Sequence, residues 1–386
     1  MTDFRIAVVG AGIGGLFAAV ACQKAGFPVT VFEQAEKIEP LGASLSLWPN
    51  AMQCIANLGL AQPVQDQGAL IAQLAIRGID QRPYFTLPLQ PIYNRLEQSG
   101  YCIRRAALHS ILLDALSPGS LKLGYQVNDM LTHPGQTELS FANHETHRFD
   151  LVIAADGIWS TLRSKILGQS LPDYGGYGAW LGLGSAPAPD PTLNEACEYF
   201  GPGGRFGLFE TGNSQRYWFF VAKRKSPTRH PEMVDPHSLL NTLKDWPSFV
   251  RDQVAAATTK TVPYVSFFDR PVGAVWGSDQ ILLLGDAMHP YLPNLGQGAC
   301  QAIEDGHVLA HGLRVGLRGA RLRQFYQTAR HKRARNFGRV SRRMGRISQA
   351  EGVIGRGFQR IFYAGIPTSL FAKDMQQQFT LPKLTH

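Results

Sequence analysis

An α/β fold, with a β-rich insertion and a helical C-terminal segment, is predicted by three features of this sequence. Near the N-terminus, a short apolar run enters a glycine-rich turn, which is typical of a buried parallel strand leading into a helix. Alternating aromatic residues from Tyr174 to about Phe268 indicate an antiparallel sheet with one buried face. The end of the chain is expected to form a long basic helix to about Gln349, followed by shorter helical pieces.

The N-terminal glycine motif predicts a dinucleotide site. Residues 5–9 form the expected strand, and Gly10, Gly12 and Gly15 follow it in the spacing G-x-G-x-x-G. Such glycines allow a tight turn and a close approach to a pyrophosphate, which the free N–H groups of the helix start attract. A second strand ends at Glu33, where a carboxylate suits a free ribose hydroxyl. The motif alone does not separate FAD from NAD, because both contain adenosine diphosphate.

The other elements are placed by patterns of apolar, proline and glycine residues. Before the aromatic stretch we expect a strand around Ser44 and Ser46, a helix from Asn50 to Leu58, and short proline-broken strands from Leu70 to about Leu96. An extended piece at Cys102 should then enter a helix to Leu116. After that helix we expect a strand from Leu121 to Val127, a hairpin of residues 137–141 and 146–149, and a buried strand of residues 150–155. Within and after it we expect strands at 177–183, 198–200, 205–209 and 216–222, one helix from about Pro236 to Val254, a buried strand before Gly285, and a glycine-rich loop, 293–298, that opens a helix.

Composition describes an ordinary globular protein. The chain has 386 residues, of which 44% are hydrophobic and 17% charged, enough for two domains or one elaborated domain. The N-terminus carries Asp3 and Arg5 and enters the first strand directly, so we expect no signal peptide and a cytoplasmic location. No apolar run is long enough to span a bilayer. The five cysteines form no C-x-x-C pair, which argues against a redox disulfide and a metal site.

The net charge of +9 is concentrated near the C-terminus. Between Arg314 and Arg360 there are fourteen Arg or Lys residues against one acid, Glu351. We expect a solvated helix face that also raises the electrostatic potential near an anionic cofactor. Contact with an anionic membrane is the less favoured alternative, and nucleic acid is not expected as a partner.

Three motifs stand in order along the chain: Gly10–Glu33, Asp156-Gly157 and Gly285-Asp286. With these, and with residues 41–50 and 285–298, the chain resembles the group A flavoprotein monooxygenases of the para-hydroxybenzoate hydroxylase fold. Locally it resembles the FAD-dependent urate hydroxylases and the zeaxanthin epoxidase branch. The resemblance extends to about Gln349. It implies a Rossmann-like FAD-binding domain (1–70, 99–172 and 276–345), an inserted mixed or antiparallel β-sheet substrate domain (71–98 and 173–275), and a C-terminal helical segment (346–386).

The resemblance also implies roles for individual residues. Asp286 would accept a hydrogen bond from a ribityl hydroxyl, and the 296–298 loop would meet the pyrimidine edge of the flavin. Arg105 would lie near the FAD phosphates, whereas Val127 is equally well explained as a core residue. The expected cofactor-binding residues are Gly10, Gly12, Gly14, Gly15, Glu33, Gln34, Ser46, Arg105, Val127, Asp156, Gly157, Gly285, Asp286, Gly296, Gln297, Gly298 and Ala299.

The implied reaction is that of the cofactor. NAD(P)H would reduce FAD, O₂ would add at flavin C4a, and the hydroperoxide would pass a hydroxyl group to an aromatic or conjugated small molecule. Only one dinucleotide fold is visible, so NAD(P)H is expected to dock transiently beside Asp156-Gly157. Pro293 would wall the ring, and His289 is expected to be structural. A monomer or a homodimer is expected.

The aromatic stretch is expected to supply the substrate site. The candidate residues are Arg205, Tyr177, Trp180, Tyr217, Trp218 and Phe220, with Phe206 as a further aromatic. Arg205 corresponds to an arginine that activates substrate in the urate hydroxylases, or it is a surface strand residue. Ala179 replaces the substrate asparagine of those enzymes and Trp218 their tyrosine, so a larger, more apolar ring than urate is expected. The alternatives are an epoxidase or hydroxylase of a polycyclic or isoprenoid substrate, and a non-oxygenating flavoprotein oxidase, reductase or redox sensor.

Overall fold

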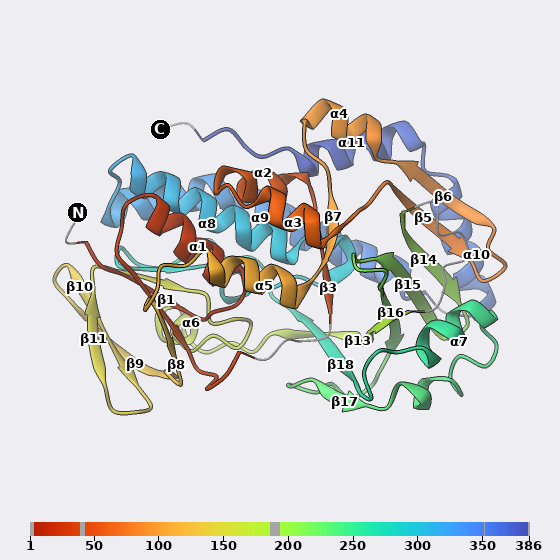
Figure 1. Ribbon diagram of the computed structural model, residues 1–386, viewed down its shortest axis with the longest axis horizontal. Coiled ribbons are helices and arrows are strands. Elements are labelled where there is room, and N and C mark those ends of the chain that lie inside the picture. The colour runs from red at the N-terminus through yellow and green to blue at the C-terminus, as the bar shows by residue number, and fades with distance from the viewer. Residues whose placement is uncertain (1–3, 39–42, 186–193, 351, 385–386) are drawn as a thin grey trace.

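The computed structural model describes residues 4–38, 43–185, 194–350 and 352–384 of the chain. Asp3, Leu41, Gly42 and Glu351, which entered the sequence analysis, lie outside the described residues. A parallel sheet with its covering helices occupies one end of the molecule, and a larger sheet occupies the other (Figure 1). This mixed α/β architecture confirms the predicted fold class.

The parallel sheet carries the N-terminal glycine motif. Its strands run in the order β19-β12-β1-β2-β8, and each neighbouring pair is parallel. They are β1 (Ile6–Val9), β2 (Val29–Glu33), β8 (Leu121–Leu123), β12 (Leu151–Ala154) and β19 (Ile281–Leu283). Parallel sheets are covered on both faces, and here α1 (Ile13–Lys24) packs against β1, β2 and α8 (Gly298–Arg314). A three-stranded sheet, β9 (Val127–His133), β10 (Gln136–Phe141) and β11 (Thr146–Phe149), places Phe141 and Phe149 against Phe32 of β2.

The larger sheet has eight strands in the order β17-β18-β13-β16-β15-β14-β5-β6. Its strands are β5 (Gln73–Gly78), β6 (Pro83–Pro88), β13 (Asp173–Gly184), β14 (Glu195–Gly201), β15 (Gly204–Glu210), β16 (Arg216–Lys223), β17 (Glu232–Val234) and β18 (Val262–Asp269). The sheet is mixed, because β5 and β14 are parallel whereas the other neighbours are antiparallel. It draws strands from both stretches assigned to a substrate domain, and the domain boundaries themselves stay a prediction.

Smaller elements connect the two ends. A short antiparallel sheet has the order β3-β7-β4. The connecting elements are β3 (Ser44–Leu47), α2 (Pro49–Asn57), α3 (Ala61–Gln67), β4 (Ala69–Leu70), β7 (Tyr101–Arg104), α5 (Arg105–Asp114) and α6 (Thr161–Leu167). The C-terminal helices are α9 (Gly319–Ser348), α10 (Gly352–Ala364) and α11 (Thr368–Phe379), of which α10 and α11 lie beside the large sheet (Figure 1).

Three expected elements differ from the structure. The strand expected from Leu121 to Val127 is split at Gly124, which has a φ of +76° and turns the chain from β8 into β9. The end of the proline-broken stretch is not a strand but α4 (Gln90–Leu96), which accepts Pro91 in its first turn, where no N–H is needed. The single helix expected from Pro236 to Val254 is a 3₁₀ turn followed by α7 (Ser248–Ala255), because Pro247 interrupts it.

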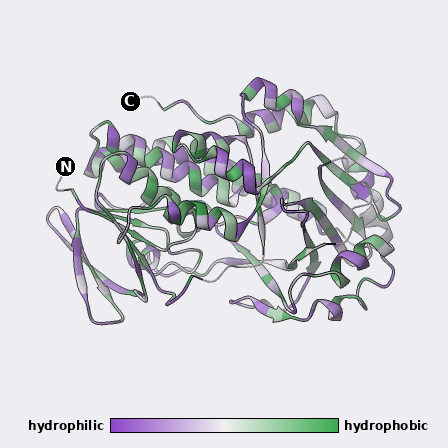
Figure 2. Cartoon of the chain, viewed as in Figure 1, coloured by the Kyte–Doolittle hydropathy of each residue, from purple (hydrophilic) through white to green (hydrophobic). Residues whose placement is uncertain are grey.

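The basic C-terminal stretch is only partly a solvated face. Hydrophilic and hydrophobic residues alternate along α8 and α9 (Figure 2). Arg330 of α9 is 1% exposed, and Arg323 and Arg342 pair with the carboxylates of Asp279 and Asp269. Part of the positive charge therefore forms ion pairs with acidic residues of the protein. None of the described helices is both long and apolar enough to cross a bilayer.

A buried charge cluster joins α8 to α9. The Arg330 guanidinium donates to the Glu304 carboxylate and, from Nε, to Asp305 over 2.6 Å. Arg333 donates to both Glu304 oxygens at 2.7 Å. Burial raises the pKa of Glu304 while Arg330 and Arg333 lower it, and the net pKa lies below the ordinary value. For Asp305, burial is likewise outweighed by His289 and Arg330, so its pKa is lowered.

This cluster also holds three loops. Asp305 Oδ2 accepts from the Gly285 N–H at 2.9 Å and lies 2.6 Å from His289 Nε2. Glu304 accepts from the Asn50 amide at 2.6 Å, and the same amide donates to Gln297 at 3.1 Å. The segments that begin α2, follow β19 and precede α8 are therefore fixed to one buried centre.

The substitution Arg330→Met should strongly destabilise the fold, because it leaves two buried carboxylates with too little positive charge. We expect a loss of about 3–5 kcal/mol in the free energy of unfolding, measured by urea denaturation. Arg335→Met is the matched control, since Arg335 is an exposed residue of the same helix, and its effect should stay within about 0.5 kcal/mol. Equal effects of the two substitutions would contradict the role of the cluster.

The free energy of unfolding at acidic pH should depend on the same two carboxylates, Glu304 and Asp305. Their lowered pKa values stabilise the folded state above about pH 4, and this stabilisation is lost as the pH falls through the folded-state pKa values. Because Arg330 lowers both pKa values, Arg330→Met should lose less stability than the wild-type protein as the pH falls, so the two plots of unfolding free energy against pH should converge at low pH. Parallel acid-unfolding curves would contradict this assignment.

Candidate active site

The turn between β1 and α1 accepts only glycine at two points and leaves open space at a third. Gly10 has a φ of +103°, and a Cβ on it would lie 2.4 Å from the Ala155 carbonyl oxygen. A Cβ on Gly15 would lie 2.0 Å from the Gly10 carbonyl oxygen. A Cβ on Gly12 would meet no atom of the described residues within 4 Å. The backbone ahead of α1 is thus bare, as an approaching phosphate requires. Gly14 instead packs on Ala302 of α8, 2.8 Å from where its Cβ would lie.

Glu33 organises the neighbouring turn. Its carboxylate, at the carboxyl end of β2, accepts from the Ala11 N–H at 2.8 Å and from the Ala35 N–H at 3.0 Å. Gln34 follows it and is exposed. Val127 is buried and pairs with Phe141 at the start of β9, so its side chain belongs to the core.

Asp286 lies in a recess after β19. Asp286 is exposed, but desolvation by the surrounding protein raises its pKa. The electrostatic effects of His289 and Arg105 act in the opposite direction and lower this pKa. The pKa of Arg105, at the start of α5, is lowered overall, because the effect of burial exceeds the raising effect of Asp286. The recessed carboxylate of Asp286, after β19, and the desolvated guanidinium of Arg105, on α5, therefore lie near each other.

The loop before α8 faces β3. Pro293 is exposed, and Gly296 has a φ of +60°. A Cβ on Gly296 would lie 3.8 Å from the Ser46 Cβ, whereas one on Gly298 would meet no atom within 4 Å. Gln297 is buried and Ala299 half-buried. The start of α8 therefore presents bare backbone N–H groups and the positive end of a helix dipole beside β3.

Asp156 caps α6. Its carboxylate accepts from the Ser160 hydroxyl at 2.6 Å and from the Leu162 N–H at 3.2 Å. Gly157 has a φ of +79° and open space over its Cα. The two residues thus form a bare turn after β12.

Two buried arginines lie near this turn. Arg163 is 8% exposed, and its Nε has no hydrogen-bond partner among the described residues. Among the described residues, its Nη1 reaches only the Ala287 carbonyl, at 3.5 Å, and the Met288 sulfur. Arg270 donates to Ser170 and to the Ile158 carbonyl, and burial and then Arg163 lower its pKa. Among the described residues neither arginine forms a salt bridge, so this region favours an anion.

One face of the large sheet points toward the 292–298 loop. Tyr177, Ala179 and Val221 form one buried cluster with Leu292. Arg205 lies opposite Val221 in the register, and Phe209 lies opposite Tyr217 four residues further along each strand. Leu181, Phe219 and Phe267 pack half-buried against the cluster. Apart from the ion pair of Arg205 with Glu198 and the tyrosines, the residues named on this front face are apolar.

Trp180, Trp218 and Phe220 lie on the opposite face. Trp218 and Phe220 are fully buried with Val250 and Val254 of α7, and Trp180 packs against them. Phe206 belongs to the same back cluster. The expectation that these aromatics share a site with Arg205 is therefore corrected, because successive residues of a strand point to opposite faces. Counting alternate positions along β13 from Tyr177 and along β16 from Tyr217 selects Leu181 and Phe219, which were not among the predicted residues.

Arg205 connects the front face to the loop. It is 4% exposed, and its guanidinium lies 2.8 Å from the Glu198 carboxylate and 2.9 Å from Asn294 Oδ1. The Asn294 amide donates to the Tyr177 hydroxyl at 2.7 Å and to the Ser341 carbonyl at 3.0 Å. Burial raises the pKa of Tyr177, and the phenol stays neutral. Sheet, loop and α9 therefore meet at Asn294, next to Pro293.

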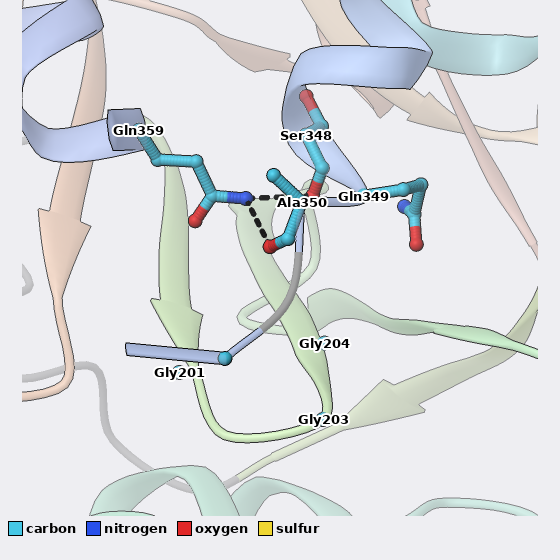
Figure 3. Close-up of a pocket in the computed structure, with 8 residues that line it drawn as sticks. Gly201, Gly203, Gly204, Ser348, Gln349, Ala350 and Gln359 are labelled. Atoms are coloured by element: carbon cyan, nitrogen blue, oxygen red, sulfur yellow. Dashed lines mark hydrogen bonds between the residues drawn. The ribbon is translucent and has the colours of Figure 1, made fainter. Parts of the chain in front are cut away.

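A small pocket opens where the β14–β15 turn meets the end of α9 (Figure 3). Gly201, Gly203 and Gly204 line it from the turn. From α10, the Gln359 amide donates to the carbonyls of Ile347, Ser348 and Ala350 at 3.0–3.1 Å and so caps α9. The pocket contains no predicted site residue and no titratable side chain. Among the described residues, no group of His, Cys, Asp and Glu could hold a metal ion.

Comparison with known proteins gives consistent relatives. The FAD binding domain family model matches residues 3–343. Aurachin C monooxygenase/isomerase of Stigmatella aurantiaca is 30% identical, over 91% of each chain. The 3-amino-4-hydroxybenzoate 2-monooxygenase of Streptomyces platensis is 32% identical, over 88% of this chain and 87% of its own. The crystal structure of Klebsiella pneumoniae HpxO complexed with FAD and uric acid superposes with a TM-score of 0.89 and 26% identity, over 97% of this chain and 96% of that one.

Filling the open space at Gly12 should remove the bound flavin. We expect Gly12→Val to purify without FAD, because the valine side chain would stand where a phosphate approaches the backbone; flavin absorbance per protein measures it. Gly273→Val is the matched control, since Gly273 also has no neighbour within 4 Å of its Cβ. Equal flavin content in the two variants would contradict this phosphate site.

Proposed function

The chain belongs to the FAD binding domain family and is an FAD-dependent monooxygenase, and we propose that its substrate is a largely apolar aromatic or conjugated ring system. Electrons come from NAD(P)H and the transferred oxygen atom from O₂. The apolar front face of the sheet carries this proposal: Leu181, Phe219 and Phe267 face the loop at Pro293 and lie half-buried, available to a ligand. Ala179 on that face adds no polar group.

The residues present fit FAD. Gly10, Gly12 and Gly15 form a cradle for the pyrophosphate, and the recessed Asp286 suits a ribityl hydroxyl. Arg105, desolvated and near Asp286, would hold phosphate charge. When bound, FAD supplies the two-electron and oxygen-transfer chemistry.

The remaining tasks belong to the protein. The N–H groups at Gly298 and the positive end of α8 would stabilise negative charge that develops on a bound flavin. Pro293 and the front face orient the substrate ring and keep water out of the site. Tyr177, held neutral and bound by Asn294, fixes the loop rather than moving a proton.

NAD(P)H docks beside Gly157. Arg163 and Arg270 have no carboxylate partner among the described residues, and a pyrophosphate or a 2′-phosphate would supply the missing negative charge. The bare turn at Gly157 allows close approach of that anion. No second dinucleotide fold is required for this transient contact.

Oxygen incorporation tests the proposed reaction. FAD-loaded protein is mixed with NADH or NADPH, labelled ¹⁸O₂ and a panel of apolar aromatic and conjugated compounds. We expect at least one compound to accelerate NAD(P)H oxidation, to gain one labelled oxygen atom by mass spectrometry, and to suppress H₂O₂ release. Stoichiometric H₂O₂ with every compound would support an oxidase instead, and labelled epoxides would support the epoxidase alternative.

Arg163 should affect the co-substrate and not the resident cofactor. We expect Arg163→Gln to raise the apparent Kd of NAD(P)H about tenfold or more, because a charged hydrogen bond is lost, with FAD content unchanged. Anaerobic stopped-flow reduction of the flavin measures this constant. Lys165→Gln on the same helix is the control, since Lys165 is exposed and pairs with Asp129. A lower FAD content with normal NAD(P)H affinity would contradict the assignment.

A further inference from the structure

The ion pair of Glu198 and Arg205 lies on the front face, with Arg205 buried and Glu198 half-buried. The two residues stand on neighbouring strands, β14 and β15, with 2.8 Å between Oε2 and Nη1. Glu198 lies opposite Gly207 in the register, where a Cβ would stand 2.1 Å from the Phe219 ring. Glu198, Arg205 and Phe219 are therefore neighbours on one wall.

Glu198 is the only acidic side chain that hydrogen-bonds Arg205 among the described residues. The other hydrogen-bond partner of Arg205 is the neutral Asn294 amide, and Tyr177 beyond it is also neutral. Glu198 is half-buried, with its side chain 24% exposed. The pair is thus close to neutral as a unit, and without the carboxylate the wall would carry one uncompensated positive charge.

We propose that Glu198 is a specificity-determining residue, which neutralises Arg205 and makes the site prefer uncharged aromatic substrates over aromatic carboxylates and other anions. The inference rests on the proposed function, since it requires an aromatic ligand on the front face. Discrimination of this kind acts against the wrong ligand, because an anion gains no free positive charge here and meets the Glu198 carboxylate. A bare arginine on the same wall would instead recruit anions.

The size of the effect follows from Coulomb's law. A full charge some 6 Å from a ligand carboxylate, in the intermediate dielectric of a half-open site, changes affinity about tenfold. The change should appear in the ratio of affinities for charged and uncharged ligands, which a purely structural role of the ion pair would not move.

Binding of two isosteric probes, naphthoate and naphthamide, tests the proposal on FAD-loaded protein without NAD(P)H. Dissociation constants are measured at neutral pH by calorimetry and by perturbation of the flavin absorbance. The wild-type protein should bind naphthamide more tightly than naphthoate. Glu198→Gln should shift the ratio toward naphthoate about tenfold, whereas Glu198→Asp, which keeps the charge, should retain the wild-type preference.

Arg205 provides an independent arm, should Glu198→Gln fold poorly. Arg205→Gln leaves Glu198 uncompensated and should weaken naphthoate binding further while changing naphthamide little. The double variant Glu198→Gln/Arg205→Gln should return to the wild-type ratio. An unchanged ratio in Glu198→Gln, or a wild-type preference for naphthoate, would overturn the inference and leave the proposed function standing. Failure of every form to bind either probe would instead refute the aromatic site itself.

Discussion

The buried cluster of Glu304, Asp305 and Arg330 is the interaction on which the cofactor side of the structure depends. Two adjacent carboxylates inside a helix would be untenable without Arg330, which is 1% exposed and contacts both. Arg333 and Asn50 also donate to Glu304, and the Gly285 N–H donates to Asp305. One electrostatic requirement therefore fixes the relative positions of loops that are far apart in the sequence, and those loops are the ones proposed to contact FAD.

A second set of hydrogen bonds, centred on Asn294, connects the loop before α8 to the large sheet. The Asn294 amide contacts Arg205 and Tyr177 of the sheet and the Ser341 carbonyl of α9. The C-terminus adds a further connection, because Phe379 stacks on Trp48 with 5.0 Å between ring centroids and the Gln378 carbonyl accepts from Arg333. Residues beyond the stretch that resembles the family thus belong to the same framework, and the loop at Pro293 is braced from the sheet and from α9.

The sequence predicts features that depend on local chemistry and misses those that depend on distant partners. The glycine spacing at Gly10, the acid ending β2 and the helix start at Gly298 each follow from the geometry of a strand, a turn or a helix. The charge cluster could not be inferred, since Asn50 and Glu304 are 254 positions apart. The assignment of Trp218 to the substrate wall failed for a different reason: strand alternation was available in the sequence but was not applied across β15 and β16.

The arginines of this basic chain divide according to whether an acid accompanies them, and the division locates ligand charge. Arg330 and Arg205 are buried and paired with carboxylates, so each positive charge is neutralised within the protein and attracts an anionic ligand only weakly. Arg163 and Arg270 are also buried but hydrogen-bond only neutral acceptors among the described residues. Since desolvating a lone guanidinium is unfavourable, such a pair persists where an anionic group completes it. Unpaired charge therefore marks the region proposed for the anionic co-substrate, and paired charge marks the wall proposed for an uncharged ring.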